Sequence, residues 1–96
     1  AMNREADWQL GPFVRHPTPI LEARPELRFD CPVAGRSVAW AAKDLFNPGA
    51  VVRDGKVCLL VRAEDADGRY AGTSRVGLAT SDDGIRFTIE PTPVLY

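Results

Sequence analysis

The sequence predicts a mostly β fold: a four-stranded antiparallel meander preceded by an extended, proline-rich arm. Proline breaks helices and is tolerated mainly at strand edges, and five of the eight prolines lie in residues 1–35. Beyond this arm, two Asp-Gly pairs at 54–55 and 83–84 separate short apolar segments, as two-residue hairpin turns do. No segment carries a convincing helical periodicity, and residues 37–46 come nearest to one.

Residues 1–35 form the arm and residues 36–96 the sheet in this prediction. The prolines of the arm are Pro12, Pro17, Pro19, Pro25 and Pro32. Its apolar residues are Trp8, Leu10, Phe13, Ile20, Leu21, Leu27 and Phe29. These are too few to build a separate core, so we expect the arm to pack across another part of the protein.

The sheet is built from four predicted strands. They cover residues 50–53, 56–62, 74–81 and 85–89. The two Asp-Gly pairs supply the positive φ angles of tight turns, whereas residues 63–72 are polar, contain glycine and are predicted to form a loop. In the last strand Ile85, Phe87 and Ile89 alternate with polar residues, which places them on one face.

A meander of this length is the size of one blade of a β-propeller, which has about 40–50 residues. A single small sheet has two open edges and two faces to cover, and it is only marginally stable in water. We therefore expect this sheet to associate with more protein, either the remainder of a larger propeller or further copies of itself.

The composition is that of a globular domain and argues against several function classes. Hydrophobic residues make up 45% and charged residues 26% of the chain, which argues against disorder. A net charge of −1 indicates no basic face for nucleic acid, and the longest apolar run, 57–61, is far too short for a membrane span. The N-terminus, beginning with Ala1, shows no apolar signal core.

Two cysteines, Cys31 and Cys58, are present. They are too few for a disulfide framework or for a zinc site built on thiolates. Cys58 lies inside an apolar run, where a thiol behaves as a small buried hydrophobe. We expect both thiols to be reduced and the protein to be cytoplasmic.

The predicted meander brings two polar residues together. Asn47 precedes the first strand and Arg62 ends the second, so antiparallel pairing places them at the same end of the sheet. An amide and a guanidinium offer planar donors that can hold sugar hydroxyls or an oxyanion. Arg75 begins the next strand and is placed to join them. The alternative is that Asn47 caps a turn and Arg62 pairs in solvent with Glu64 or Asp65.

Other polar or aromatic residues carry weaker signals. The acidic cluster at 64–67 lacks the spacing of a calcium-binding loop, and acidic loop residues are usually solvated. His16 is a lone histidine in the arm, where packing or surface exposure is expected. Trp8 and Trp40 are suited to stacking on a sugar, but a role in the core is favoured.

Six motifs, in order along the chain, resemble the N-terminal motifs of glycoside hydrolase family 130. They are LGPF at 10–13, FNPGAVV at 46–52, DGKV at 54–57, LLVRAED at 59–65, TSRVGLA at 73–79 and SDDGIRF at 81–87. Together they span nearly the whole chain, and the run 46–65 is the most specific. The family comprises β-mannoside phosphorylases and related mannosidases on a five-bladed β-propeller, so the resemblance implies that fold and a carbohydrate substrate.

The resemblance also implies roles for individual residues. Asn47 and Arg62 match family positions that contact the mannosyl unit, and Asp65 and Arg75 match neighbouring positions around that pocket. The family's general acid is an aspartate in a Glu-Asp-Pro-Arg-like motif, which residues 1–96 do not contain. We therefore expect no catalytic residue, metal or cofactor in this chain. The implied ligand is a β-mannoside oligosaccharide, with inorganic phosphate as co-substrate if the protein is a phosphorylase.

Two hypotheses of function follow from these patterns. In the first, the chain is the N-terminal fragment of a β-mannoside phosphorylase or glycosidase, which contributes to the mannosyl subsite and is inactive alone. In the second, it is a non-catalytic, blade-like binding or structural module that self-associates through its open strand edges. The oligomeric state of the purified chain discriminates between them.

Overall fold

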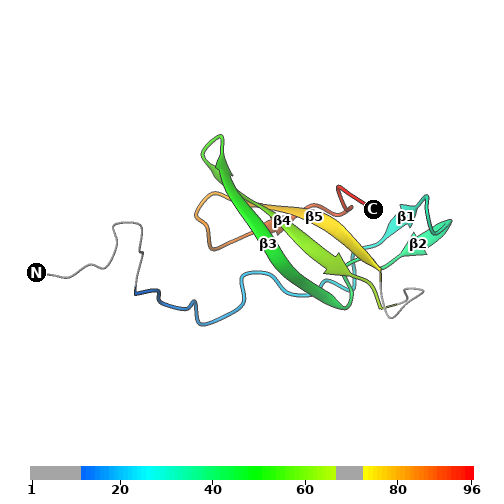
Figure 1. Ribbon diagram of the computed structural model, residues 1–96, viewed down its shortest axis with the longest axis horizontal. Helices are drawn as coiled ribbons and strands as arrows, with labels where there is room; N and C mark the ends of the chain where they lie inside the picture. The colour runs from blue at the N-terminus through cyan, green and yellow to red at the C-terminus, as the bar shows by residue number, and fades with distance from the viewer. Residues whose placement is uncertain (1–11, 67–72) are drawn as a thin grey trace, which may run out of the picture.

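The described part of the chain contains strands and no helix. The structure is a computed structural model that describes residues 12–66 and 73–96. The six strands are β1 (Phe29–Cys31), β2 (Arg36–Val38), β3 (Asp44–Arg53), β4 (Lys56–Glu64), β5 (Ser74–Ser81) and β6 (Thr88–Ile89). Four of them form one antiparallel sheet in the order β3-β4-β5-β6 (Figure 1). This arrangement confirms the predicted meander, and residues 37–46 form no helix.

The β3–β4 hairpin and strand β5 follow the prediction closely. Asp54 and Gly55 have φ angles of 52° and 75°, the left-handed values that a tight hairpin turn requires. Strand β5 covers the predicted residues and pairs antiparallel with β4. The turn chemistry and the β-branched residues on either side of it are local signals, which is why the sequence predicts this part well.

Strand β3 begins at Asp44, earlier than predicted, because the chain pairs with β4 on both sides of an irregularity. The register shifts between Phe46 and Gly49, so Asn47 and Pro48 lie in a β-bulge. Proline has no N–H to give to a ladder, and a bulge is one of the few places where a strand tolerates it. The prediction that Asn47 precedes the strand is therefore wrong: it lies within β3.

The fourth strand is shorter than predicted, because β6 starts at Thr88 and not at Ile85. The Asp83 carboxylate accepts hydrogen bonds from the backbone N–H groups of Ile85 and Arg86, at 2.9 and 2.8 Å. These bonds curl the chain into a turn and leave the Ile85 side chain exposed. The predicted alternation holds only after the turn, at Phe87 and Ile89, which pack in the core.

The same turn makes an acid-sensitive contribution to stability. The N–H groups of Arg86 and Ile85, and then the Ser81 hydroxyl, lower the pKa of Asp83 from 3.8 to about 2. Because the folded-state pKa lies below the unfolded one, the stabilisation is complete above about pH 4 and is lost as the pH falls to about 2. In the wild type, the urea concentration at the unfolding midpoint should therefore fall as the pH is lowered from about 4 to about 2. We expect this fall to be smaller in Asp83→Asn. An unchanged decline in the variant would contradict this assignment.

Strands β1 and β2 form a separate antiparallel hairpin that the sequence does not predict (Figure 1). Its turn contains Gly35, which has a φ of 70° and donates its N–H to the Cys31 carbonyl oxygen at 2.8 Å. Pro32 lies in the turn and not in a strand, so it does not interrupt the pairing. The hairpin crosses the expected boundary at residue 35, and its first strand belongs to the predicted arm.

The core lies on one face of the main sheet and is centred on Trp40, whose side chain is fully buried. The Trp40 Nε1–H group donates to the Pro91 carbonyl oxygen at 3.0 Å. A Cβ atom at Gly77 would lie 3.0 Å from the Trp40 ring, so glycine allows β5 to pass close to the indole. The other buried members of the core are Ala41, Leu59, Val61, Ala63, Ala79 and Ile89.

Part of the predicted arm packs against this core. Its partly buried members are Leu21, Leu27 and Phe29. The Arg24 N–H group donates to the Ala41 carbonyl oxygen at 2.8 Å, which fastens the chain next to the core. Residues 12–20 are exposed and run away from the sheet in Figure 1. The predicted anchors Trp8 and Leu10 lie outside the described residues.

The other face of the main sheet is uncovered by the described residues. Side chains alternate across a strand, so the residues between the buried positions of β4 and β5, and the β3 residues that pair with them, point to this face. Its apolar members include Phe46, Val51, Cys58, Leu60, Val76 and Leu78. Val51 of the edge strand β3 is 59% exposed and Leu60 of β4 is 51% exposed, so this face presents large aliphatic side chains to solvent.

Candidate functional site

The structure places Asn47 and Arg62 at the same end of the main sheet, as the sequence predicts. Phe46 pairs with Arg62 across β3 and β4, and Asn47 follows Phe46 in the bulge. The Arg62 guanidinium lies over the Phe46 ring, with Cζ 4.7 Å from the ring centroid. This cation–π contact holds the guanidinium against the sheet, while Asn47 and Arg62 both stay exposed.

The bulge gives Asn47 an uncommon backbone conformation. Its φ of 51° lies in the left-handed region, which asparagine adopts more readily than most non-glycine residues. Pro48 follows, and its ring restricts the next φ angle. A bulge re-aims the side chains of a strand, so these two residues set the direction in which the Asn47 amide leaves β3.

A pocket of about 460 Å³ adjoins Arg62. Its lining residues are Arg62, Ser74, Arg75, Val76, Leu95 and Tyr96. Arg62 Nε donates to Ser74 Oγ at 2.9 Å, so a hydroxyl from β5 orients the guanidinium. Leu95 reaches the pocket because it forms an antiparallel bridge with Val76, and Tyr96 follows it. Sequence reasoning missed Leu95 and Tyr96, since a single bridge leaves no periodic pattern.

Asp65 and Arg75 belong to the opposite face of the sheet from Arg62. Arg75 pairs with Ala63, and neighbouring residues of a strand point to opposite faces. The side chains of Asp65 and Arg75 are 3% and 5% exposed, and Arg75 Nη1 donates to Asp65 Oδ2 at 2.5 Å. The four residues expected around one pocket therefore form two pairs: Asn47 and Arg62 at the surface, and Asp65 and Arg75 in the interior.

The Cys31 thiol of β1 is a third member of the interior group. Arg75 Nη2 donates to Cys31 Sγ at 3.6 Å, and the Ala34 N–H group donates to the same sulfur at 3.4 Å. Burial opposes the thiolate, but hydrogen bonds from Ala34, Arg75 and Val33 and the charge of Arg75 together lower the pKa of Cys31. Burial also opposes the Arg75 cation, yet Asp65 and Cys31 outweigh it and raise the pKa of Arg75.

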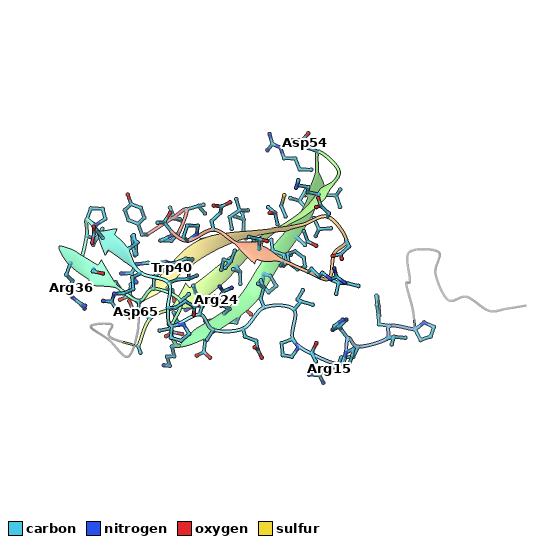
Figure 2. The ribbon with its side chains drawn as sticks, turned by 180° about the vertical axis from the view of Figure 1, so that it is seen from behind. Arg15, Arg24, Arg36, Trp40, Asp54 and Asp65 are labelled. Atoms are coloured by element: carbon cyan, nitrogen blue, oxygen red, sulfur yellow. The ribbon has the colours of Figure 1, made fainter. Side chains whose placement is uncertain are left out.

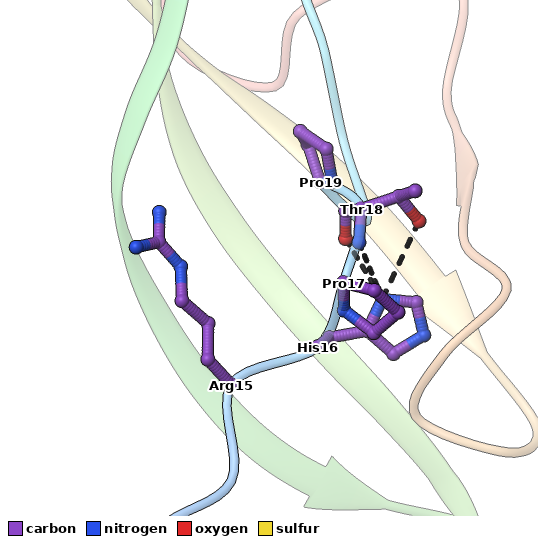
Figure 3. A pocket seen from close by; sticks show the side chains of 5 residues that line it. All are labelled: Arg15, His16, Pro17, Thr18 and Pro19. Atoms are coloured by element: carbon purple, nitrogen blue, oxygen red, sulfur yellow. Dashed lines mark hydrogen bonds between the residues drawn. The ribbon is translucent and has the colours of Figure 1, made fainter.

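The arm carries a second hollow, of about 480 Å³, lined by residues 15–19 (Figure 3). His16 Nδ1 lies 2.8 Å from the Thr18 carbonyl oxygen. All five lining residues are consecutive and exposed, so the hollow is a curve of the chain and not a cavity between elements. His16 therefore fits the expected surface role.

The remaining candidates do not add to the site. Trp40 is fully buried and presents no ring to a sugar, which agrees with its favoured role in the core. Asp67 lies outside the described residues. Within 12–66 and 73–96, no group of three or more His, Cys, Asp or Glu side chains is placed to hold a metal ion. The same residues contain no helix of the length and hydrophobicity that crosses a membrane.

Several solved structures are similar to this chain over almost its whole length. A glycosyl hydrolase from Bacteroides ovatus is 41% identical, matches over 98% of this chain and 28% of its own, and superposes with a TM-score of 0.86. A protein of Parabacteroides distasonis described as a glycoside hydrolase is 41% identical, with 93% and 26% coverage and a TM-score of 0.84.

A third structure represents the family 130 of mannoside phosphorylases, which contains glycoside hydrolases that target β-1,2-mannosidic linkages in Candida mannan. It is 44% identical, matches over 98% of this chain and 27% of its own, and superposes with a TM-score of 0.86. The chain belongs to glycoside hydrolase family 130.

This family 130 chain spans 26–28% of the length of these three proteins. A comparison with protein-family models gave no match, and neither did one with curated proteins. The membership therefore rests on identity above 40% combined with close superposition over nearly all of the chain.

Proposed function

We propose that this chain supplies part of the mannosyl-binding subsite of a family 130 β-mannoside phosphorylase or glycosidase. The observation that carries the proposal is the exposed pair of Asn47 and Arg62 at one end of the sheet, where Arg62 lines a pocket. Planar donors held on a rigid sheet are suited to adjacent sugar hydroxyls. A β-1,2-mannoside is the ligand class, in keeping with the linkage that hydrolases of this family target.

The proposed role of this chain is to bind the mannosyl unit of the substrate. The general acid of the enzyme then lies outside residues 1–96. Support for this is that residues 1–96 contain no Glu-Asp-Pro-Arg-like motif, the motif expected to carry the acid. The chain then forms the arm and first blade of a larger, five-bladed cytoplasmic enzyme. If that enzyme is a phosphorylase, the acid protonates the glycosidic oxygen while inorganic phosphate attacks the anomeric carbon.

Calorimetry with β-1,2-mannobiose tests the role of Arg62. We expect Arg62→Ala to weaken binding about tenfold or more, because a hydrogen bond from a charged group contributes about 1.5–3 kcal/mol. Arg62→Lys keeps the charge but loses the planar fork and the stacking on Phe46, so an intermediate affinity is expected.

Arg53→Ala is the matched control for this experiment. Arg53 is an exposed arginine at the opposite end of β3, so its loss should leave the affinity for mannobiose unchanged. Binding that is equally strong in the wild type and in Arg62→Ala would place the ligand elsewhere. A wild-type chain that does not bind mannobiose would contradict the proposed subsite.

A self-associating, non-catalytic module is the second candidate function. The uncovered face of the main sheet favours it, because Val51 and Leu60 expose apolar surface that a second copy of the chain would bury. Light scattering coupled to size-exclusion chromatography separates the two candidates. A dimer or larger assembly supports self-association, whereas a stable, folded monomer counts against it.

A further inference from the structure

The buried Asp65–Arg75 pair closes the end of the β4–β5 hairpin. The Asp65 N–H group donates to the Thr73 carbonyl oxygen at 3.2 Å, and the Thr73 N–H group donates to Asp65 Oδ1 at 3.2 Å. These bonds continue the pairing beyond the last rung of the two strands. Asp65 Oδ2 accepts from Arg75, so each carboxylate oxygen has a partner. In Figure 2, Asp65 lies at the end of the sheet that faces the β1–β2 hairpin.

Arg75 joins segments that are far apart in the sequence. Its Nη1 contacts Asp65 after β4, and its Nη2 contacts Cys31 in β1. Its Cζ lies 5.4 Å from the centroid of the Phe29 ring, and the centroid of that ring lies 5.6 Å from the centroid of the Tyr96 ring. Tyr96 in turn lines the pocket of the candidate site. A continuous set of contacts therefore runs from Asp65 to the wall of the pocket.

We infer that Asp65 and Arg75 are positioning residues, which hold the walls of the pocket beside Arg62 and do not touch the ligand. Arg75 is among the lining residues, but its side chain is 5% exposed and both of its terminal nitrogens are engaged. Such a guanidinium has little surface to offer a sugar, whereas Arg62 is exposed. This inference rests on the proposed function, because it concerns the same pocket.

A double-mutant cycle separates positioning from direct contact. Arg75→Met leaves the Asp65 carboxylate as an unpaired buried charge, and Asp65→Asn leaves the Arg75 cation in the same state. Each single variant should therefore weaken binding of β-1,2-mannobiose by about tenfold or more.

The double variant removes both charges at once. The new amide can still accept from the Thr73 N–H group, and the methionine side chain fills the space against Phe29. We expect the double variant to bind mannobiose within about threefold of the wild type, since a buried ion pair can be replaced by neutral groups of similar volume. If Arg75 touched the ligand, the double variant would bind as weakly as Arg75→Met, and this result would overturn the inference.

Hydrogen exchange gives a readout that needs no ligand. Val76 N–H donates to the Leu95 carbonyl oxygen at 3.0 Å, and Leu95 N–H donates to the Val76 carbonyl oxygen at 3.3 Å. We expect Arg75→Met to speed exchange of these two amides about tenfold or more relative to amides near the Asp54-Gly55 turn, and the double variant to restore it. Unchanged exchange in Arg75→Met would overturn the inference even if mannobiose binds. A third outcome is that exchange is faster in Arg75→Met and returns to the wild-type rate in the double variant, while the chain binds no mannobiose. This outcome would support the role of Asp65 and Arg75 in holding the pocket walls and would contradict only the proposed function.

Discussion

Replacing Trp40 by alanine should remove a large share of the free energy of unfolding of this chain. The Trp40 side chain is fully buried, and truncation of such a residue costs about 3–5 kcal/mol through lost burial and the cavity that remains. The Pro91 carbonyl oxygen would also lose the Nε1–H donor that lies 3.0 Å away. A small domain has a total free energy of unfolding of only about 5–15 kcal/mol. Urea unfolding followed by circular dichroism measures the loss.

Two controls test whether the loss of free energy of unfolding in Trp40→Ala arises from the central position of Trp40 in the core. Trp40→Phe keeps an aromatic ring over Gly77 but loses the indole N–H, so its cost should be smaller, about 1–3 kcal/mol. Leu60→Ala changes the uncovered face, where the side chain is half exposed, and should cost about 1 kcal/mol or less. A Trp40→Ala variant as stable as Leu60→Ala would show that the indole is not the centre of the core.

Arg75→Met should destabilise the chain almost as strongly as the loss of Trp40. It leaves the buried Asp65 carboxylate without its cation, and removal of one partner from a buried ion pair costs about 3–5 kcal/mol. The cost arises because the remaining charge is desolvated with nothing to compensate it. The double variant Asp65→Asn/Arg75→Met should recover most of this free energy of unfolding, as measured by the urea midpoint.

The exposed ion pair between Lys56 and Asp82 provides the comparison. Its nitrogen and oxygen atoms are 3.1 Å apart, and both side chains are more than half exposed. Solvent screens such a pair, so Asp82→Asn should leave the urea midpoint almost unchanged. If Arg75→Met costs no more than Asp82→Asn, then the Asp65–Arg75 pair is not a determinant of stability.

The meander could be predicted from the sequence because its signals are local. Asp54-Gly55 prescribes a tight turn by the φ angles it allows, and the segments beside it carry β-branched and alternating residues. The β1–β2 hairpin could not be predicted in this way, since its strands have three residues each and too few positions to show a period. The early start of β3 could not be predicted for a different reason. Proline usually marks the end of a strand, and Pro48 is tolerated within β3 only because it lies in a bulge.

The sequence by itself determined that four segments pair as neighbours, and that Asn47 and Arg62 meet at one end of the sheet. Strand order and antiparallel pairing follow from the short connections between the strands, and the length of each connection can be taken directly from the sequence. Only the tertiary structure decided that Asp65 and Arg75 turn inward to each other and to Cys31, and that Tyr96 reaches the pocket. Burial of a charge depends on partners far away in the chain, so no local pattern could indicate it.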